Sequence, residues 1–184
     1  RSARGHALDA TGMGLCCLEM VRAKAAGVAF SRHPVDLRSN DVVVNGLWGL
    51  GEMVVDGSGT PDQWQVSRAT NRITKTTLAL KTKHLRLNRT ADGHVESVLE
   101  PVPEDLRKVP CLSDAQARYL ASVVLDVERH YQYPQDMEWA IDEEDQIMLL
   151  QTRPMGLDST SDAQSAPVLR HLRPVLAGAD VAAR

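Results

Sequence analysis

The sequence predicts an α+β domain that is mainly antiparallel sheet, with one long helix at about residues 112–131. Short apolar and β-branched runs, separated by turn residues, indicate strands between residues 15 and 87 and again after residue 133. Apolar residues at helical spacing after Ser113 indicate the helix. With 184 residues, 43% of them apolar and 24% charged, the chain has the composition of one domain with a substantial core.

Six strand-like segments precede the helix, at residues 15–21, 25–31, 41–45, 60–67, 71–78 and 81–87. We expect the first two to form a strand–turn–strand pair, and the second to stop before Pro34, because proline lacks an N–H for the sheet ladder. The segments at 60–67 and 71–78 are expected to pair with each other, and the segment at 81–87 is basic. Residues 90–94 are typical of a turn, and residues 100–110, with three prolines, of a surface connection.

A glycine-rich run at residues 46–55 follows the third segment, has glycines at 46, 49 and 51, and is expected to lead into a helical turn. Glycines between a strand and a helix can turn backbone N–H groups toward an anion, as phosphate-binding loops do. A tight structural turn is an equally good interpretation, because the spacing matches neither a Walker nor a Rossmann motif. Glu52 either adds a carboxylate or favours the helix start.

The helix is expected to begin at Ser113, since Gln116 stands at the capping-box position. It is followed by two strand-like runs, residues 133–142 and 147–154, joined by an acidic loop at 143–146. This loop sets the hairpin register, which places Glu138 opposite Gln151, Asp136 opposite Arg153, and Trp139 opposite Leu150 as a core pair.

The hairpin register predicts a polar cluster on one strand face, because opposed side chains have Cβ atoms about 4.5–5.5 Å apart. A carboxylate (Glu138) beside an amide (Gln151) offers the oxygen ligands that Mg²⁺ prefers, and the Arg153 guanidinium suits a phosphate. The cluster therefore suggests a nucleotide phosphate site. The alternative is an exposed strand face carrying only an Asp136–Arg153 cross-strand pair.

Composition excludes several classes of protein. A net charge of −3 without a basic block argues against a nucleic-acid partner, and no apolar run approaches the roughly 20 residues that cross a membrane. Cys16, Cys17 and Cys111 fit neither a zinc site nor a disulfide scaffold, which favours a reducing, cytoplasmic location. The chain opens on Arg1 rather than Met, which suggests a fragment of a longer protein.

Several motifs, taken in order, resemble the ATP-binding domain of phosphoenolpyruvate synthases and pyruvate phosphate dikinases, from about residue 15 to residue 154. They are Gly27-Val-Ala-Phe-Ser-Arg-His-Pro34, Gly49-Leu-Gly-Glu52, Val55-Asp-Gly57, Thr60-Pro-Asp62, Ser113-Asp114, Glu128-Arg-His-Tyr131, Pro134-Gln-Asp-Met-Glu-Trp-Ala140 and Leu150-Gln-Thr-Arg-Pro154. The resemblance implies that residues 1–154 are the C-terminal part of an ATP-grasp domain, with residues 155–184 a linker or tail toward a missing phosphohistidine domain.

The resemblance also implies residue roles and cofactors, which are Mg²⁺ and ATP. Glu138 would be a Mg²⁺ ligand with Gln151, and Gln151 and Arg153 would act at the phosphates as catalytic residues. The nucleotide would be bound by the segment at the family's adenine-contacting linker, by the glycine-rich run and by a recurrent lysine: Glu19, Met20, Val21, Gly49, Gly51, Glu52 and Lys81.

The chain departs from the family in its first residues and its histidines. Position 18 is Leu where the family commonly has Gln, and Ser31 occupies a position where the family commonly has Thr. No counterpart of the family's first lobe, with its phosphate-contacting Lys and Arg, precedes residue 15. None of the six histidines lies in a phosphohistidine motif: His33 is expected in an exposed turn and His130 packed on the helix.

The implied function is the ATP-binding part of a dikinase that phosphorylates a histidine on another domain and then pyruvate, the pyruvate and phosphoenolpyruvate sites lying on missing domains. By itself this chain is expected to be inactive. The alternatives are a phosphotransferase with another acceptor, as in rifampicin phosphotransferases, and a non-catalytic nucleotide-binding module. The oligomeric state stays open.

Overall fold

The computed structural model describes residues 17, 19–36 and 38–156. The first half of this region forms β1 (Ala23–Phe30), β2 (Asp41–Trp48), the short helix α1 (Glu52–Val55), β3 (Asp62–Ser67) and β4 (Ile73–Thr77). The second half forms β5 (Lys83–Arg89), β6 (Val95–Pro101), a 3-10 turn (Glu104–Leu106), the long helix α2 (Asp114–Tyr131), β7 (Gln135–Asp142) and β8 (Ile147–Pro154).

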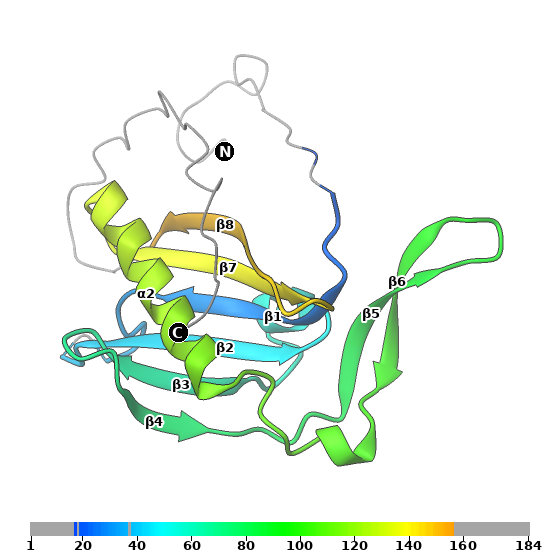
Figure 1. Ribbon diagram of the computed structural model, residues 1–184, viewed down its shortest axis with the longest axis horizontal. Coiled ribbons are helices and arrows are strands. Elements are labelled where there is room, and N and C mark those ends of the chain that lie inside the picture. Colours follow the sequence, from blue (N-terminus) through cyan, green and yellow to red (C-terminus); the bar gives the residue numbers. More distant parts are fainter. Residues whose placement is uncertain (1–16, 18, 37, 157–184) are drawn as a thin grey trace, which may run out of the picture.

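Six strands form one antiparallel sheet in the order β4-β3-β2-β1-β7-β8, and α2 crosses one of its faces (Figure 1). Strands β5 and β6 form a separate two-stranded ribbon that projects from the sheet (Figure 1). The predicted α+β class, with a mainly antiparallel sheet and one long helix, is confirmed.

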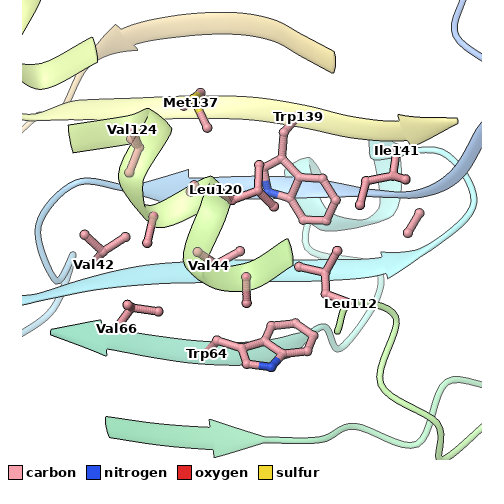
Figure 2. Packing of buried hydrophobic residues seen from close by; sticks show 14 of the residues in the cluster. Val42, Val44, Trp64, Val66, Leu112, Leu120, Val124, Met137, Trp139 and Ile141 are labelled. Carbon is pink, nitrogen blue, oxygen red and sulfur yellow. The ribbon is translucent and has the colours of Figure 1, made fainter. Parts of the chain in front are cut away.

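The core lies between α2 and the sheet. Figure 2 shows α2 with Leu120 and Val124 turned toward Trp139, Met137 and the valines of β2. Alternate residues of the strands point into this layer, and Trp64 and Trp139 are fully buried in it. The predicted capping box is present, because the Ser113 hydroxyl accepts from the backbone N–H of Gln116 while the Gln116 side chain accepts from the backbone N–H of Ser113.

The strand predicted at residues 15–21 is wrong for the residues described there. Cys17 and residues 19–21 form no strand, and Cys17, Glu19 and Met20 are exposed. The physical reason is that β1 already pairs with β2 on one side and β7 on the other, so a preceding strand has no free edge of β1 to join.

Two smaller predictions also need correction. Residues 95–101, not assigned as a strand, form β6, whose outer residues Val95 and Leu99 are about half exposed, so the strand carries no core alternation. His130 is exposed rather than packed in the core, with its ring edge-on to Tyr131.

Of the predicted tail at 155–184, only Met155 and Gly156 lie among the described residues, and Met155 is buried with its N–H bonded to the Pro134 carbonyl.

Candidate functional site

The hairpin of β7 and β8 has the predicted register only in the half away from its loop. Next to the loop, Ile141 lies opposite Ile147 and the Asp142 N–H donates to the Gln146 carbonyl at 3.1 Å, one residue off the predicted pairing. Glu138 lies opposite Gln151 and Asp136 opposite Arg153. A bulge between Glu138 and Trp139 then shifts the pairing, so that Trp139 lies opposite Leu149 and the predicted Trp139–Leu150 pair is wrong. The shift brings Leu150 out of the ladder, and its side chain lines a cavity instead.

Glu138 lies on the sheet face opposite α2, because its neighbours Met137 and Trp139 both point into the core beneath that helix. The cross-strand registers place it in a row that runs from Gln151 through Glu138 and Val28 to Asn45 and Gln63. The Gln63 amide donates to the Asn45 side-chain oxygen at 3.1 Å. The face away from α2 therefore carries polar side chains across four strands.

A cavity of about 540 Å³ opens beside Glu138, within the size range of small-ligand sites. Four separate parts of the chain build it: the segment before β1, β1 itself, the glycine-rich run with α1, and the β7–β8 hairpin. The residues that line it are Glu19, Met20, Val21, Ala23, Ala26, Gly27, Leu50, Gly51, Glu52, Val55, Asp56, Glu138, Trp139, Ala140 and Leu150.

The cavity combines an apolar wall with carboxylates. Met20, Val21, Leu50 and Leu150 belong to the apolar part, and Glu19, Glu52, Asp56 and Glu138 are acidic. Among the described residues that line it, none is a lysine or an arginine. Such a wall suits a flat, uncharged body, whereas a phosphate there would need a metal ion or cations from beyond this lining.

Arg153 is a cation on the same hairpin as Glu138, and its Nε donates to Asp136 Oδ2 at 2.8 Å. This hydrogen bond and the negative charges of Asp136 and Glu138 raise the pKa of Arg153 above its ordinary value. The Arg153 side chain is 57% exposed, so donors other than its Nε–H can meet a ligand. Gln151 is exposed in the same strand.

Asp136, predicted only as the cross-strand partner of Arg153, is buried as well as paired. It is 8% exposed, and its second oxygen, Oδ1, is buried without a hydrogen-bond partner among the described residues. An unsatisfied buried carboxylate oxygen is costly, and a bound cation is one way to satisfy it. The alternation that places Asp136 and Glu138 on one face of β7 was the available signal.

The oxygen donors of this face fit Mg²⁺. No group of three or more His, Cys, Asp or Glu side chains is placed to hold a metal within the described part of the chain. Mg²⁺ commonly binds through one or two carboxylates together with waters and substrate phosphates, and Glu138 with Gln151 opposite it fits that pattern.

The glycine-rich run is held by its own backbone. Gly49 has φ +78°, its N–H donates to the Lys24 carbonyl at 2.9 Å, and the Leu50 N–H donates to the Leu85 carbonyl at 2.8 Å. A Cβ on Gly49 would lie 2.1 Å from Leu85 O. Gly49 thus forms a tight turn outside the cavity, while Gly51 and Glu52 line the cavity.

Lys81 does not reach the cavity. It is 2% exposed, and its Nζ donates to Asp62 Oδ1 at 2.7 Å and to the Ala79 carbonyl at 3.2 Å. Asp62 also accepts from the backbone N–H groups of Ala79 and Cys111. Burial and the neighbouring Asp62 raise the pKa of the Cys111 thiol well above its usual value.

The predicted site residues are thus only partly brought together. Glu19, Met20, Val21, Gly51, Glu52 and Glu138 line one cavity. Gln151 and Arg153 lie beside it on the hairpin, and Gly49 and Lys81 lie elsewhere. In addition, none of the helices in the described ranges is long and apolar enough to cross a bilayer.

An open antiparallel sheet with an acidic and apolar cavity on the face away from its helix has the features of a nucleotide-binding α+β lobe. Residues 1–173 match the family model described as pyruvate phosphate dikinase, AMP/ATP-binding domain. The chain belongs to this family.

Curated relatives support the same assignment. The chain is 36% identical over 140 residues to a probable phosphoenolpyruvate synthase of Methanocaldococcus jannaschii, covering 74% of this chain and 11% of that protein. It is 33% identical over 164 residues to the phosphoenolpyruvate synthase of Pyrococcus furiosus, covering 87% of this chain and 20% of that protein. It is 34% identical over 143 residues to an uncharacterized phosphotransferase, YvkC, of Bacillus subtilis, covering 78% of this chain and 16% of that protein. The aligned region is therefore only a fifth or less of each of these relatives.

Proposed function

We propose that this chain is the ATP-binding part of a phosphoenolpyruvate synthase-like dikinase, an ATP-grasp lobe that acts within a longer protein. There a phosphoryl group from Mg·ATP would pass to a histidine on another domain and then to pyruvate. The observation that carries the proposal is the position of Glu138, which lines the cavity and lies opposite Gln151 in the hairpin. Family membership supports ATP as the ligand.

The residues divide the work by chemistry. The apolar wall formed by Met20, Val21 and Leu50 would hold the adenine and exclude water from it. Glu138 and Gln151 would hold Mg²⁺, which when bound neutralises phosphate charge. Arg153, fixed by Asp136 through one hydrogen bond, would direct its free donors to the phosphates, where charge develops during transfer.

The cytoplasmic location belongs to the same proposal. Cys17 and Cys111 are free thiols, and Cys17 is exposed, which fits a reducing compartment. The pyruvate and histidine sites would belong to other parts of the longer protein, because the chain spans a fifth or less of those relatives.

Calorimetry of ATP binding to the 184-residue chain, with Mg²⁺ and with a chelator, tests the metal site. We expect Mg²⁺ to strengthen ATP binding to the wild-type chain, and Glu138→Gln to remove that gain while leaving the weaker metal-free binding. Glu144→Gln is the matched control, because Glu144 is exposed in the loop of the same hairpin and does not line the cavity. Equal Mg²⁺ dependence in both variants would remove Glu138 from the site.

A further inference from the structure

A second cavity, of about 340 Å³, lies where the start of β1, the end of β2, strand β5 and the β7–β8 turn meet. It shares Ala23 with the first cavity and has a different chemistry. Its side chains include two cations, a histidine, an acid and an apolar wall: Lys24, Arg86, His84, Glu143, Trp48 and Leu106. Nothing in the proposed ATP site uses these residues.

Within the described part of the chain, both cations of this cavity are held only by weak surface pairs with the β7–β8 turn. Lys24 Nζ lies 2.7 Å from Asp145 Oδ1, and an Arg86 nitrogen lies 3.5 Å from Glu143 Oε1. All four side chains are roughly half exposed, and such pairs contribute little because water screens them. A carboxylate entering the cavity can therefore replace Glu143 as the partner of Arg86.

His84 adds a buried imidazole to the cavity. It is 8% exposed, and burial first, then the nearby charge of Arg86, lowers its pKa, while Glu100 opposes the change. The imidazole is therefore a neutral hydrogen-bonding group in the neutral pH range, placed near the cation of Arg86 and opposite Glu100 in the ribbon. An anion bound next to it would favour its protonated form.

The apolar wall is fixed in place. The Trp48 indole N–H donates to the Leu106 carbonyl at 3.2 Å, so the polar edge of the ring is already used. The remaining ring surface, together with Val102 and Leu106, can pack against carbon.

We propose that this cavity binds a small organic carboxylate with an apolar or aromatic body, held at its charged end by Arg86 and His84 and at its body by Trp48. The size of the cavity, near the lower end for ligand sites, suits a molecule of about one aromatic ring. The guanidinium can meet a carboxylate with two parallel hydrogen bonds.

Benzoate is a suitable probe, and benzamide is its uncharged match. Nuclear magnetic resonance of the 184-residue chain should show saturable shifts of the His84 ring and the Trp48 indole N–H on adding benzoate, with the pKa of His84 rising. Benzamide should cause no comparable shift. Addition of ATP should leave these signals unchanged, so the result is independent of the proposed ATP site.

Two substitutions with opposite effects sharpen the test. Arg86→Gln should weaken benzoate binding at least about tenfold, the usual loss for a hydrogen bond to a charged group. Glu143→Gln removes the competing carboxylate and should tighten binding by up to about fivefold. Arg89→Gln, an exposed arginine on the same strand that does not line the cavity, should change nothing.

Four results would overturn the proposal. The first three are no saturable shift at His84 with benzoate at tens of millimolar, an equal response to benzamide, and displacement of benzoate by ATP. The fourth is undiminished benzoate binding in Arg86→Gln, with unchanged Trp64 signals establishing that this variant is folded.

Discussion

Lys81 and Asp62 form an ion pair whose side chains are both completely buried. Two buried charges are stabilising only if every donor and acceptor is satisfied. Here the Asp62 carboxylate accepts hydrogen bonds from the Lys81 ammonium and from two backbone N–H groups. This network joins β3 to the segments that precede β5 and α2. The same lysine that was predicted to contact the nucleotide is therefore placed to hold the fold together.

We expect Lys81→Met to destabilise the protein by about 3–5 kcal/mol, because it leaves the Asp62 carboxylate buried without its cation. Urea unfolding measures this cost. Lys83→Met is the control, since Lys83 is exposed two residues further along, and it should change stability by no more than about 0.5 kcal/mol. Unchanged stability with lost ATP binding in Lys81→Met would instead favour the nucleotide-binding role.

Glu128 is a second residue whose charge matters to the fold. It accepts two hydrogen bonds from Arg68, at 2.8 and 2.9 Å, and Arg68 also donates to the Ser31 carbonyl. Burial by itself would raise the pKa of Glu128, but the hydrogen bonds from Arg68 and Ser31 and the charges of Arg68 and Arg32 outweigh it. The pKa is therefore lowered from the ordinary 4.5.

When folding lowers the pKa of a carboxyl group, its ionised form stabilises the folded state. This contribution is fully present at pH values above the pKa of the group in the unfolded chain, and it is lost as the pH falls through its pKa in the folded protein. Glu128→Gln should therefore cost about 1–3 kcal/mol at pH 7 and show a smaller further loss below about pH 4.5 than the wild type. Urea midpoints at pH 7 and pH 3 measure both effects. The exposed Asp126→Asn on the same helix should behave as wild type, and an equally steep acid loss in Glu128→Gln would contradict the assignment.

At the scale of elements, the glycine-rich run depends on the ribbon of β5 and β6. The Leu85 carbonyl accepts a hydrogen bond from the Leu50 N–H, and the same carbonyl lies where a side chain on Gly49 would be. This contact fixes the backbone just before Gly51 and Glu52 enter the cavity wall. The geometry of the candidate ATP cavity is therefore set partly from outside the main sheet.

Replacement of Gly49 separates this contact from simple backbone strain. Gly49→Ala should both destabilise the protein and weaken ATP binding, because its Cβ meets Leu85 O and the run must shift. Gly57→Ala is a matched control: Gly57 has a similar φ of +74°, but none of the described residues lies within 4 Å of its added Cβ. It should cost only about 1 kcal/mol, with ATP affinity unchanged. Equal ATP affinities for the two variants, measured by calorimetry, would count against a shift of the cavity wall.

For the whole molecule, the sequence predicted what depends on local periodicity. Alternation predicted the strands β7 and β8, but Glu138 lies opposite Gln151 as predicted only because the bulge offsets a one-residue shift in the pairs beside the loop. The bulge after Glu138 leaves no mark in that alternation, so the Trp139 pairing was missed. The burial of Lys81 depends on Asp62, nineteen residues away in sequence, and could not be inferred from a basic strand.

The false strand at 15–21 has a similar explanation at this scale. Its residues are apolar enough for a strand, but the pairing capacity of β1 is set by β2 and by β7, and β7 follows more than a hundred residues later. The segment contributes Glu19, Met20 and Val21 to the cavity wall instead. Apolar composition alone thus could not distinguish a cavity-lining segment from a core strand.

The division between a six-stranded sheet and a projecting two-stranded ribbon predicts unequal local stability. Strands β1, β2 and β7 are packed beneath α2 with core residues at 0–2% exposure, whereas Val95 and Leu99 of the ribbon are about half exposed. Because an isolated two-stranded ribbon is marginally stable, its outer part can open without unfolding the sheet. Hydrogen exchange should therefore be slowest for amides of β1, β2 and β7 and much faster near the β5–β6 turn. The Leu50 amide donates to the Leu85 carbonyl at the base of the ribbon, so it should exchange more slowly than the amides of the turn. Equal protection of the ribbon and of β1 would instead show that the ribbon and the sheet form one cooperative unit.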